Sequence, residues 1–233
     1  MGEKITVATW NAEWLSRRSG KFERATERIA ELRADILVLT ELTLDLIPGK
    51  GHVLLGSEDW GYPREGERHK VALWSHWPIE DGASDLIDPP GRHVAGTVQS
   101  PLGPIRVHGV CVPWRDAHVR TGRRDSRPWQ EHLDFLDSLA TVLNEERRGS
   151  TIDPDFRTIL GDINQRGGRQ PYRNDEVRER WNTLCSTETL TPVTPDEIID
   201  KIALGGGLEA SRIETFDPNG ISDHHAVSCR VGV

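Results

Sequence analysis

Short segments of apolar residues, alternating with polar residues or running together, predict β-strands along most of the chain. A continuous apolar run indicates a strand that is buried on both faces, and ILVL at positions 36–39 is such a run. Pro78 is expected to end another strand, and PLGP at 101–104 forms the turn of a hairpin. The predicted strands cover residues 4–10, 36–39, 70–79, 91–100, 104–112, 157–162, 198–204 and 225–231.

Helical spacing of apolar residues interrupts this strand pattern at three places. Residues 21–33, 128–143 and 175–185 are predicted as helices, and Pro128 suits the start of the second. Strands interleaved with helices predict an α/β or α+β fold with much antiparallel pairing. No internal repeat or change of composition marks a boundary, so we expect a single domain over residues 1–233.

Composition narrows the class of protein. At 36% hydrophobic and 28% charged residues the chain is typical of a soluble globular protein, and it contains no run of about 20 apolar residues for a membrane helix. The opening MGEKITVATW passes directly from charged residues into a strand pattern, so we expect no signal peptide and a cytoplasmic location. Cys111, Cys185 and Cys229 form no CxxC pair, which fits a reducing compartment and argues against a zinc–thiolate site. A monomer is the expected state.

The distribution of charge bears on possible partners. A net charge of -8 argues against a non-specific nucleic-acid coat, which usually needs a basic surface. Phosphate substrates remain open, because a bound divalent cation inverts the local field of an acidic cleft. Between Arg115 and Gln130 five arginines stand against two aspartates. This segment is either a solvated loop or a loop that grips phosphate.

Acids and amides stand at the ends of the apolar strands. These residues are Asn11, Glu13, Glu41, Asp162, Asn164, Asp200, Asp223 and His224. Alone, each is commonly a turn residue, and Asp200 is explained as well by an exposed position on an edge strand. Together they are harder to explain in this way, because buried carboxylates are costly unless they are paired or bind a cation. Oxygen ligands of this kind indicate Mg²⁺ or Mn²⁺ rather than zinc.

Five motifs in a fixed order carry a family resemblance. TWNAEW, ADILVLTEL, LGDIN, IDKIAL and ISDHHAV follow one another between Thr9 and Val227, and KVALWSHWPI is a further, less specific match. The set resembles the endonuclease/exonuclease/phosphatase superfamily, the DNase I-like hydrolases of phosphodiesters and phosphomonoesters. The resemblance implies a four-layer sandwich of two mixed, largely antiparallel β-sheets flanked by helices. Competing motifs such as a P-loop, GxSxG, HExxH or GxGxxG are absent.

The resemblance also implies a metal site. Glu41 would be the principal Mg²⁺ ligand, with Mn²⁺ as an alternative ion. Asn11 and Glu13 would complete or flank the site, and they share one face if their strand continues. Asp223 would lie near a second metal position, so the sequence leaves one or two ions open.

Catalytic roles follow from the same resemblance. Asp162 would activate or orient the attacking water, and Asn164 would hold that water or a phosphate oxygen. His224 would contact the scissile phosphate, oriented and kept protonated by Asp200, because a nearby carboxylate favours imidazolium. His225 should point to the opposite side of the sheet and be structural.

One position departs from the family pattern. Family members usually carry His or Tyr, able to assist the leaving group, where VHGVCVPW places Cys111. A thiol is a poor substitute in an apolar site, because burial raises its pKa. A metal-bound water, His118 or Arg115 are the alternatives, with His118 otherwise a plain loop histidine.

The nature of the substrate is the open question. Trp114 is expected either to stack on a base or sugar or to pack at the rim, and Arg115 lies beside it. Arg166, with Arg169 and Arg173, would reach phosphate from the loop after LGDIN. The leading hypothesis is a Mg²⁺-dependent phosphodiesterase or nuclease. A phosphatase for small metabolites or lipid head groups and a non-catalytic binding protein are the alternatives.

Overall fold

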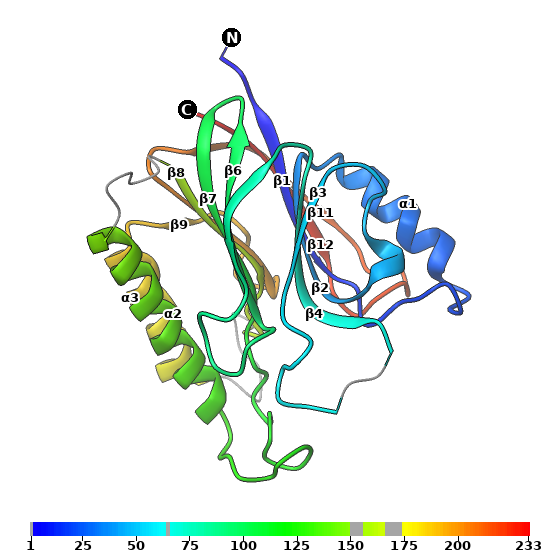
Figure 1. The fold of residues 1–233 in the computed structure, drawn as a ribbon, viewed down its shortest axis with the longest axis vertical. Coiled ribbons are helices and arrows are strands. Elements are labelled where there is room, and N and C mark those ends of the chain that lie inside the picture. The colour runs from blue at the N-terminus through cyan, green and yellow to red at the C-terminus, as the bar shows by residue number, and fades with distance from the viewer. Residues whose placement is uncertain (1, 64–65, 150–155, 166–173) are drawn as a thin grey trace.

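The apolar strand segments form two mixed six-stranded sheets in a computed structural model of the chain (Figure 1). The structure describes residues 2–63, 66–149, 156–165 and 174–233. The first sheet has the spatial order β11 (Glu209–Phe216), β12 (Ala226–Gly232), β1 (Ile5–Asn11), β2 (Ile36–Thr43), β4 (Arg68–Ser75), β3 (His52–Leu55). The second has the order β5 (Ile79–Ala83), β6 (His93–Ser100), β7 (Gly103–Cys111), β8 (Phe156–Asp162), β10 (Asp200–Gly205), β9 (Thr191–Pro192).

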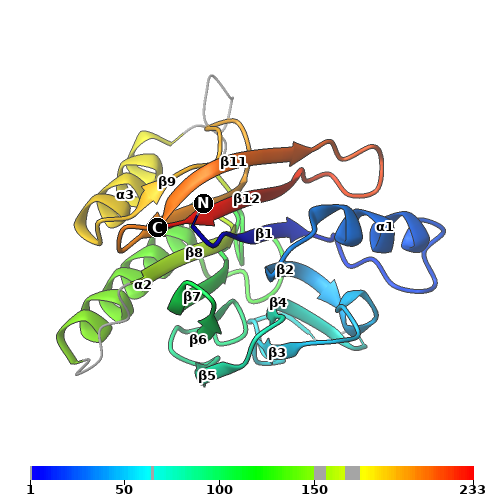
Figure 2. The same cartoon turned by 90° about the horizontal axis from the view of Figure 1, so that it is seen from above.

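Helices cover the two outer faces of this pair of sheets. Helix α1 (Phe22–Leu32) packs on the first sheet, and α2 (Gln130–Gly149) and α3 (Asp175–Thr187) lie together on the second (Figures 1 and 2). The helix–sheet–sheet–helix order confirms the predicted four-layer sandwich, and all three predicted helices are present. No helix in the described part of the chain is long and apolar enough to cross a membrane.

The two sheets are joined by an apolar core between their facing surfaces. Val7, Val38 and Val71 of the first sheet pack in one cluster with Val107 and Leu160 of the second. All are essentially inaccessible to solvent, and burying such a side chain contributes roughly 1.5–3 kcal/mol. The clamped sheets hold the ends of their strands in fixed relative positions.

Strand register places the residues that the sequence singled out next to one another at the ends of their strands. In the second sheet Asp162 pairs with Cys111 on the parallel strand β7 and with Asp200 on the antiparallel strand β10. In the first sheet Asn11 pairs with Thr40 of the parallel strand β2. Parallel and antiparallel neighbours therefore place three second-sheet residues side by side, each at the end of its strand.

The strand predicted for residues 70–79 is the clearest correction to the fold. The structure ends β4 at Ser75 and begins β5 at Ile79, and these strands belong to different sheets. The serine hydroxyl accepts a hydrogen bond from the Trp77 amide at 3.0 Å, which fixes a bend. Pro78 follows and has no amide hydrogen for a sheet ladder. Residues 76–78 therefore connect the first sheet to the second.

A buried histidine pair lies between the second sheet and α2. His93 Nε2 is 3.2 Å from His108 Nδ1, and His108 Nε2 is 3.1 Å from Glu146 of α2. Burial lowers the pKa of His93 to about 3, helped by the neighbouring His108. Burial alone would raise the pKa of Glu146, but its bonds to His108 and Arg106 lower it to about 2. His93 is therefore neutral in the folded protein at ordinary pH.

Replacing His93 with glutamine is expected to make the fold less sensitive to mild acid. The folded pKa of His93 lies below its ordinary value, so only the unfolded chain takes up this proton as pH falls below 6.5. At pH 5 this costs the wild type about 2 kcal/mol of stability, which H93Q avoids. Urea unfolding at pH 7 and pH 5 measures the difference. H52Q, at an exposed histidine of β3, should keep the wild-type pH dependence. An unchanged loss in H93Q contradicts the prediction.

Candidate active site

Four side chains, three on strands and one in the segment before β12, form the centre of the candidate site. Asn11 is the last residue of β1, Asp162 the last of β8 and Asp200 the first of β10. His224 stands two residues before β12. All four side chains are buried, so none is the solvated turn residue that each resembles in isolation. Asp200 in particular is not exposed on an edge strand.

Asp162 is held by amide groups on both of its oxygens. Oδ2 accepts hydrogen bonds from Asn11 Nδ2 at 2.9 Å and from Asn164 Nδ2 at 3.1 Å. Oδ1 accepts from the Asn164 main-chain amide at 2.8 Å. The Asn164 backbone is left-handed, with φ 53°, a conformation that costs a non-glycine residue about 1–3 kcal/mol and gathers at functional sites. The carboxylate is thereby fixed in one orientation.

The protonation of Asp162 depends on its burial and on the charges around it. Burial raises the pKa of its carboxyl to about 6. His224 opposes this rise, whereas the neighbouring carboxylates Asp200 and Glu41 add to it. A carboxylate whose pKa is raised towards neutrality suits a proton acceptor, and such perturbed groups mark functional sites.

His224 and Asp200 form a buried ion pair. His224 Nδ1 lies 2.6 Å from Asp200 Oδ2. Burial alone would lower the pKa of His224, but the charge and hydrogen bond of Asp200 outweigh it and raise the pKa to about 10. The ring is therefore an imidazolium at neutral pH. Its Nε2 lies 3.5 Å from Asp223, whose side chain is 69% exposed, so this nitrogen is on the solvent side.

Ser222 is a supporting residue that sequence reasoning missed. Its hydroxyl donates to the Asn11 carbonyl at 2.8 Å and accepts from the His224 amide at 3.1 Å. The two bonds tie the His224 loop to the end of β1. The motif ISDHH shows a serine before Asp223, but the sequence does not show that this serine bonds to Asn11 at the end of β1.

Glu41 lies within β2 rather than at its end, and it has a cationic partner. Its backbone is left-handed, with φ 47°, and β2 continues to Thr43. Lys70 of β4 donates its ammonium group to Glu41 Oε1 in an ion pair that is largely shielded from solvent. The same ammonium lies 4.9 Å from the centre of the Trp14 ring. Sequence reasoning missed both partners.

Glu13 and Asp223 lie at the solvent side of this edge. The strand β1 ends at Asn11, so Glu13 does not share its face; it is exposed in a left-handed turn with φ 48°. Its main-chain amide donates to Asn11 Oδ1 at 2.9 Å. Binding of a metal ion by Glu13 and Asp223 remains a prediction.

The oxygen atoms that these side chains offer are of the type that binds a hard cation. Carboxylates Glu41 and Asp162 and the amide of Asn11 offer oxygen, the ligand that Mg²⁺ and Mn²⁺ prefer. Burial is the main cause of the raised pKa of Asp162, and a bound cation would relieve the repulsion from Asp200 and Glu41 that adds to it. Among the described residues no three His, Cys, Asp or Glu side chains are already gathered as a metal cage.

Cys111 remains a protonated thiol. It is fully buried beside Asp162, and burial raises its pKa to about 12. Lys70 and Arg92 oppose that rise, but they do not reverse it. Arg92, another residue that sequence reasoning missed, is 2% exposed and donates to the Cys111 carbonyl at 3.4 Å. The thiol is neither nucleophile nor ready acid here.

His118 is a structural clamp. Its Nδ1 lies 2.6 Å from Glu131 Oε1 and its Nε2 lies 2.5 Å from the Gly61 carbonyl, while Tyr62 stacks on the ring at 4.2 Å. The side chain has no exposed surface, and both nitrogens face acceptors. Neither nitrogen is left for the substrate or leaving group that the sequence suggested, so His118 instead joins the loop at 61–62 to α2.

The loop after β7 carries an exposed indole to the rim of the site. Val112 donates its amide to the Asp162 carbonyl at 2.9 Å and accepts from Asn164 Nδ2 at 2.8 Å. Trp114, two residues further, is 46% exposed. Arg115 follows, 3.7 Å from the carboxylate of Asp116. The predicted phosphate contact Arg166 lies outside the described residues.

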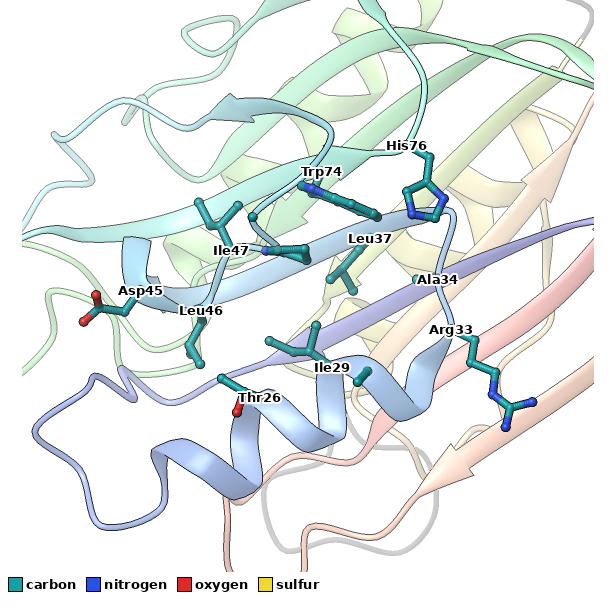
Figure 3. A pocket seen from close by; sticks show the side chains of 13 residues that line it. Thr26, Ile29, Arg33, Ala34, Leu37, Asp45, Leu46, Ile47, Trp74 and His76 are labelled. Carbon is teal, nitrogen blue, oxygen red and sulfur yellow. The ribbon is translucent and has the colours of Figure 1, made fainter.

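A separate hollow is apolar and stands apart from these residues. It has a volume of about 580 Å³, and no predicted site residue lines it. Figure 3 shows Ile29 of α1 and Leu37 of β2 pointing towards one another inside it, while the Arg33 side chain points away. Its acid, Asp45, is paired with Arg17 at 2.7 Å. Arg33 and His76 also line the hollow, but Asp45 is the single carboxylate among its described lining residues, so the hollow differs from the cluster of acids at the strand ends.

Known proteins match this arrangement over nearly the whole chain. The sequence model of the Endonuclease/Exonuclease/phosphatase family matches residues 8–224. No match to the sequence is found among curated proteins.

Solved structures share the fold at low sequence identity. NExo from Neisseria, a 3′ phosphatase bound to product DNA hairpin, has a TM-score of 0.69 and 19% identity, covering 97% of this chain and 98% of that chain. An endonuclease/exonuclease/phosphatase from Beutenbergia cavernae has a TM-score of 0.64 and 17% identity, covering 99% and 72%. Sphingomyelinase C from Streptomyces griseocarneus has a TM-score of 0.57 and 14% identity, covering 99% of this chain and 100% of that chain.

Proposed function

The chain belongs to the endonuclease/exonuclease/phosphatase family of phosphoester hydrolases, and we propose that it is a divalent-metal-dependent phosphodiesterase acting on nucleic acid or nucleotides. The observation that carries this proposal is the buried His224–Asp200 pair, with an ion-pair distance of 2.6 Å. Asp200 pairs with Asp162 where β10 begins and β8 ends. The arrangement supplies a fixed positive charge next to a fixed carboxylate, which is the pair of groups that water attack on a phosphate ester requires.

Binding of the metal would fall to Glu41 and Asn11, with Glu13 and Asp223 at the solvent side. Mg²⁺, or Mn²⁺ in its place, supplies a Lewis acid for a phosphoryl oxygen. The oxygen-only donor set and the crowding of carboxylates around Asp162 support this assignment.

The chain's own groups would divide the acid–base work. Asp162, with its pKa raised to about 6, accepts a proton from the attacking water, and the Asn164 amide holds the carboxylate in line. His224 donates from Nε2 to a phosphate oxygen, while its Nδ1 stays on Asp200. A donor that is fixed before the reaction stabilises the charge that develops in the transition state.

Trp114 favours a nucleotide-containing substrate. An exposed indole at the rim offers a stacking face for a base, a contact worth about 1–3 kcal/mol in single-strand binding proteins. The fold alone does not choose the substrate, since its solved examples include a protein bound to a DNA hairpin and a sphingomyelinase. The exposed aromatic side chain is therefore what directs the proposal towards nucleic acid.

A substrate panel tests the proposal. We expect turnover of a single-stranded oligonucleotide and of bis-p-nitrophenyl phosphate with Mg²⁺ or Mn²⁺, and none with EDTA. W114A should raise KM for the oligonucleotide about 5- to 150-fold and change the KM for bis-p-nitrophenyl phosphate less, because only the oligonucleotide carries bases. Supercoiled plasmid reports endonuclease action. Turnover of mono-p-nitrophenyl phosphate alone would instead assign a phosphatase, and no metal-dependent turnover would assign a binding protein.

A further inference from the structure

Lys70 and Glu41 are held opposite one another by the pairing of β2 with β4. Thr40 pairs with Val71 and Leu42 pairs with His69, so Glu41 and Lys70 lie between two fixed pairs. Lys70 is 9% exposed, and its ammonium bonds directly to Glu41 Oε1. The contact is therefore part of the sheet register and not a chance meeting of two surface chains.

This contact places the positive charge of Lys70 on the carboxylate of Glu41, and the proposed metal ion must bind the same carboxylate. An ammonium group and a divalent cation both need the carboxylate oxygens of Glu41, and like charges at such short range repel strongly in a partly desolvated site. Lys201, which is also buried, does not stand in this position, because it bonds to the carbonyls of Pro195 and Asp196.

A second resting place for the Lys70 ammonium is already present. It lies 4.9 Å from the centre of the Trp14 ring, within the range of a cation–π contact. Trp14 is fixed relative to Glu41, because its amide donates to the Glu41 carbonyl at 2.6 Å. Its ring also stacks on Trp60 at 5.6 Å. An ammonium that leaves Glu41 therefore retains a favourable partner and stays beside the site.

We propose that Lys70 is a tethered cation that competes with the metal for Glu41, and thereby sets a weak metal affinity for this site. The proposal rests on the proposed function, since it takes Glu41 as the metal ligand. When metal binds, the Lys70 ammonium gives up Glu41 and is retained on the face of Trp14. The protein exchanges one cation for another at a single carboxylate instead of filling a vacant, wholly anionic cage.

Metal affinity in the absence of substrate tests this competition. Calorimetric titration with Mg²⁺ should show K70M binding at least about tenfold more tightly than wild type, because the competing charge is gone. K70Q, which keeps a hydrogen-bonding group, guards against poor folding of K70M and should bind more tightly as well. K201M removes a lysine of similar burial away from Glu41 and should retain the wild-type affinity.

Thermal unfolding gives an independent readout. With EDTA, K70M should melt below wild type because Glu41 has lost its partner, and Mg²⁺ should raise its melting temperature more than it raises that of wild type. E41Q, introduced into the wild type and into K70M, should abolish the Mg²⁺ binding of both proteins and the difference in their response to Mg²⁺.

The outcomes separate this inference from the proposed function. Equal or weaker Mg²⁺ binding by K70M and K70Q, with clear binding by wild type, would overturn the competition and leave the metal site standing. Tighter binding by K201M as well would show a general charge effect and overturn the specific contact. No Mg²⁺ binding by any variant would overturn both the inference and the metal-dependent function.

Discussion

Replacing His224 with alanine is expected to lower kcat about 10²- to 10⁴-fold, the range for loss of a positioned acid–base group. The imidazolium is held by Asp200 at 2.6 Å, and alanine leaves no donor at that place. Because the interaction is assigned to the transition state, KM should change much less than kcat. Steady-state kinetics on bis-p-nitrophenyl phosphate with saturating Mg²⁺ provides the measurement.

His225 supplies the matched control for that experiment. It is the next residue along the chain, and its Nε2 lies 3.5 Å from the exposed Asp217 rather than near Asp200. H225A should retain kcat within about threefold, as expected for a partly exposed side chain outside the site. Equal catalytic losses in the two variants would refute the division of roles within the histidine pair.

Replacing Asp200 with asparagine is expected to make activity fall at alkaline pH. In the wild type the pKa of His224 is about 10, so this group stays charged through pH 9. Without the Asp200 charge, burial lowers the pKa of His224 against the weaker opposition of Asp162 and Asp223. The kcat of D200N should then decline about tenfold per pH unit above the new pKa, with the decline beginning well below pH 9.

Profiles of kcat between pH 6 and 9.5, with an NMR titration of the His224 ring, measure this effect. D217N, which removes the acid near His225, should keep the wild-type profile. An unshifted His224 titration in D200N would contradict the assigned cause.

The same ion pair has a definite effect on stability. The folded pKa of His224 lies above the ordinary 6.5, so its contribution is fully present below pH 6.5 and is lost as pH rises through about 10. D200N should therefore be less stable than wild type at pH 6, by the roughly 3–5 kcal/mol typical of a broken buried pair.

Local patterns predicted much of the fold, and they singled out polar residues at strand ends that the structure brings together. The apolar run at 36–39 lies within β2, and helical spacing found all three helices. Residues at strand ends, such as Asp162 and Asp200, proved to be neighbours because sheet register places strand ends together. These acids could be singled out from the sequence because a carboxylate next to an apolar strand is costly to bury unless it is paired or binds a cation.

The features that were missed depend on partners distant in sequence. Strand β11 has exposed residues along almost its whole length and, among the strands that the structure describes, pairs only with β12, so it lacks the apolar alternation of a half-buried strand. Lys70 resembles an ordinary strand residue until β2 places Glu41 beside it. His118 resembles a loop residue until Gly61 and Glu131, on either side of it along the chain, enclose it. No local pattern carries such information.

The position of β12 between β11 and β1 links assembly of the site to the order of folding. Residues Ile5 and Thr9 pair with Val231 and Val227, so these contacts close a loop of nearly the whole chain. Long-range pairing of this kind carries a loop-closure cost and is slow compared with local contacts. During synthesis, β1 lacks this neighbour until β12 has been made. The candidate site, which takes Asn11 from the end of β1 and His224 from the segment before β12, therefore cannot form until both of these distant parts of the chain have been made.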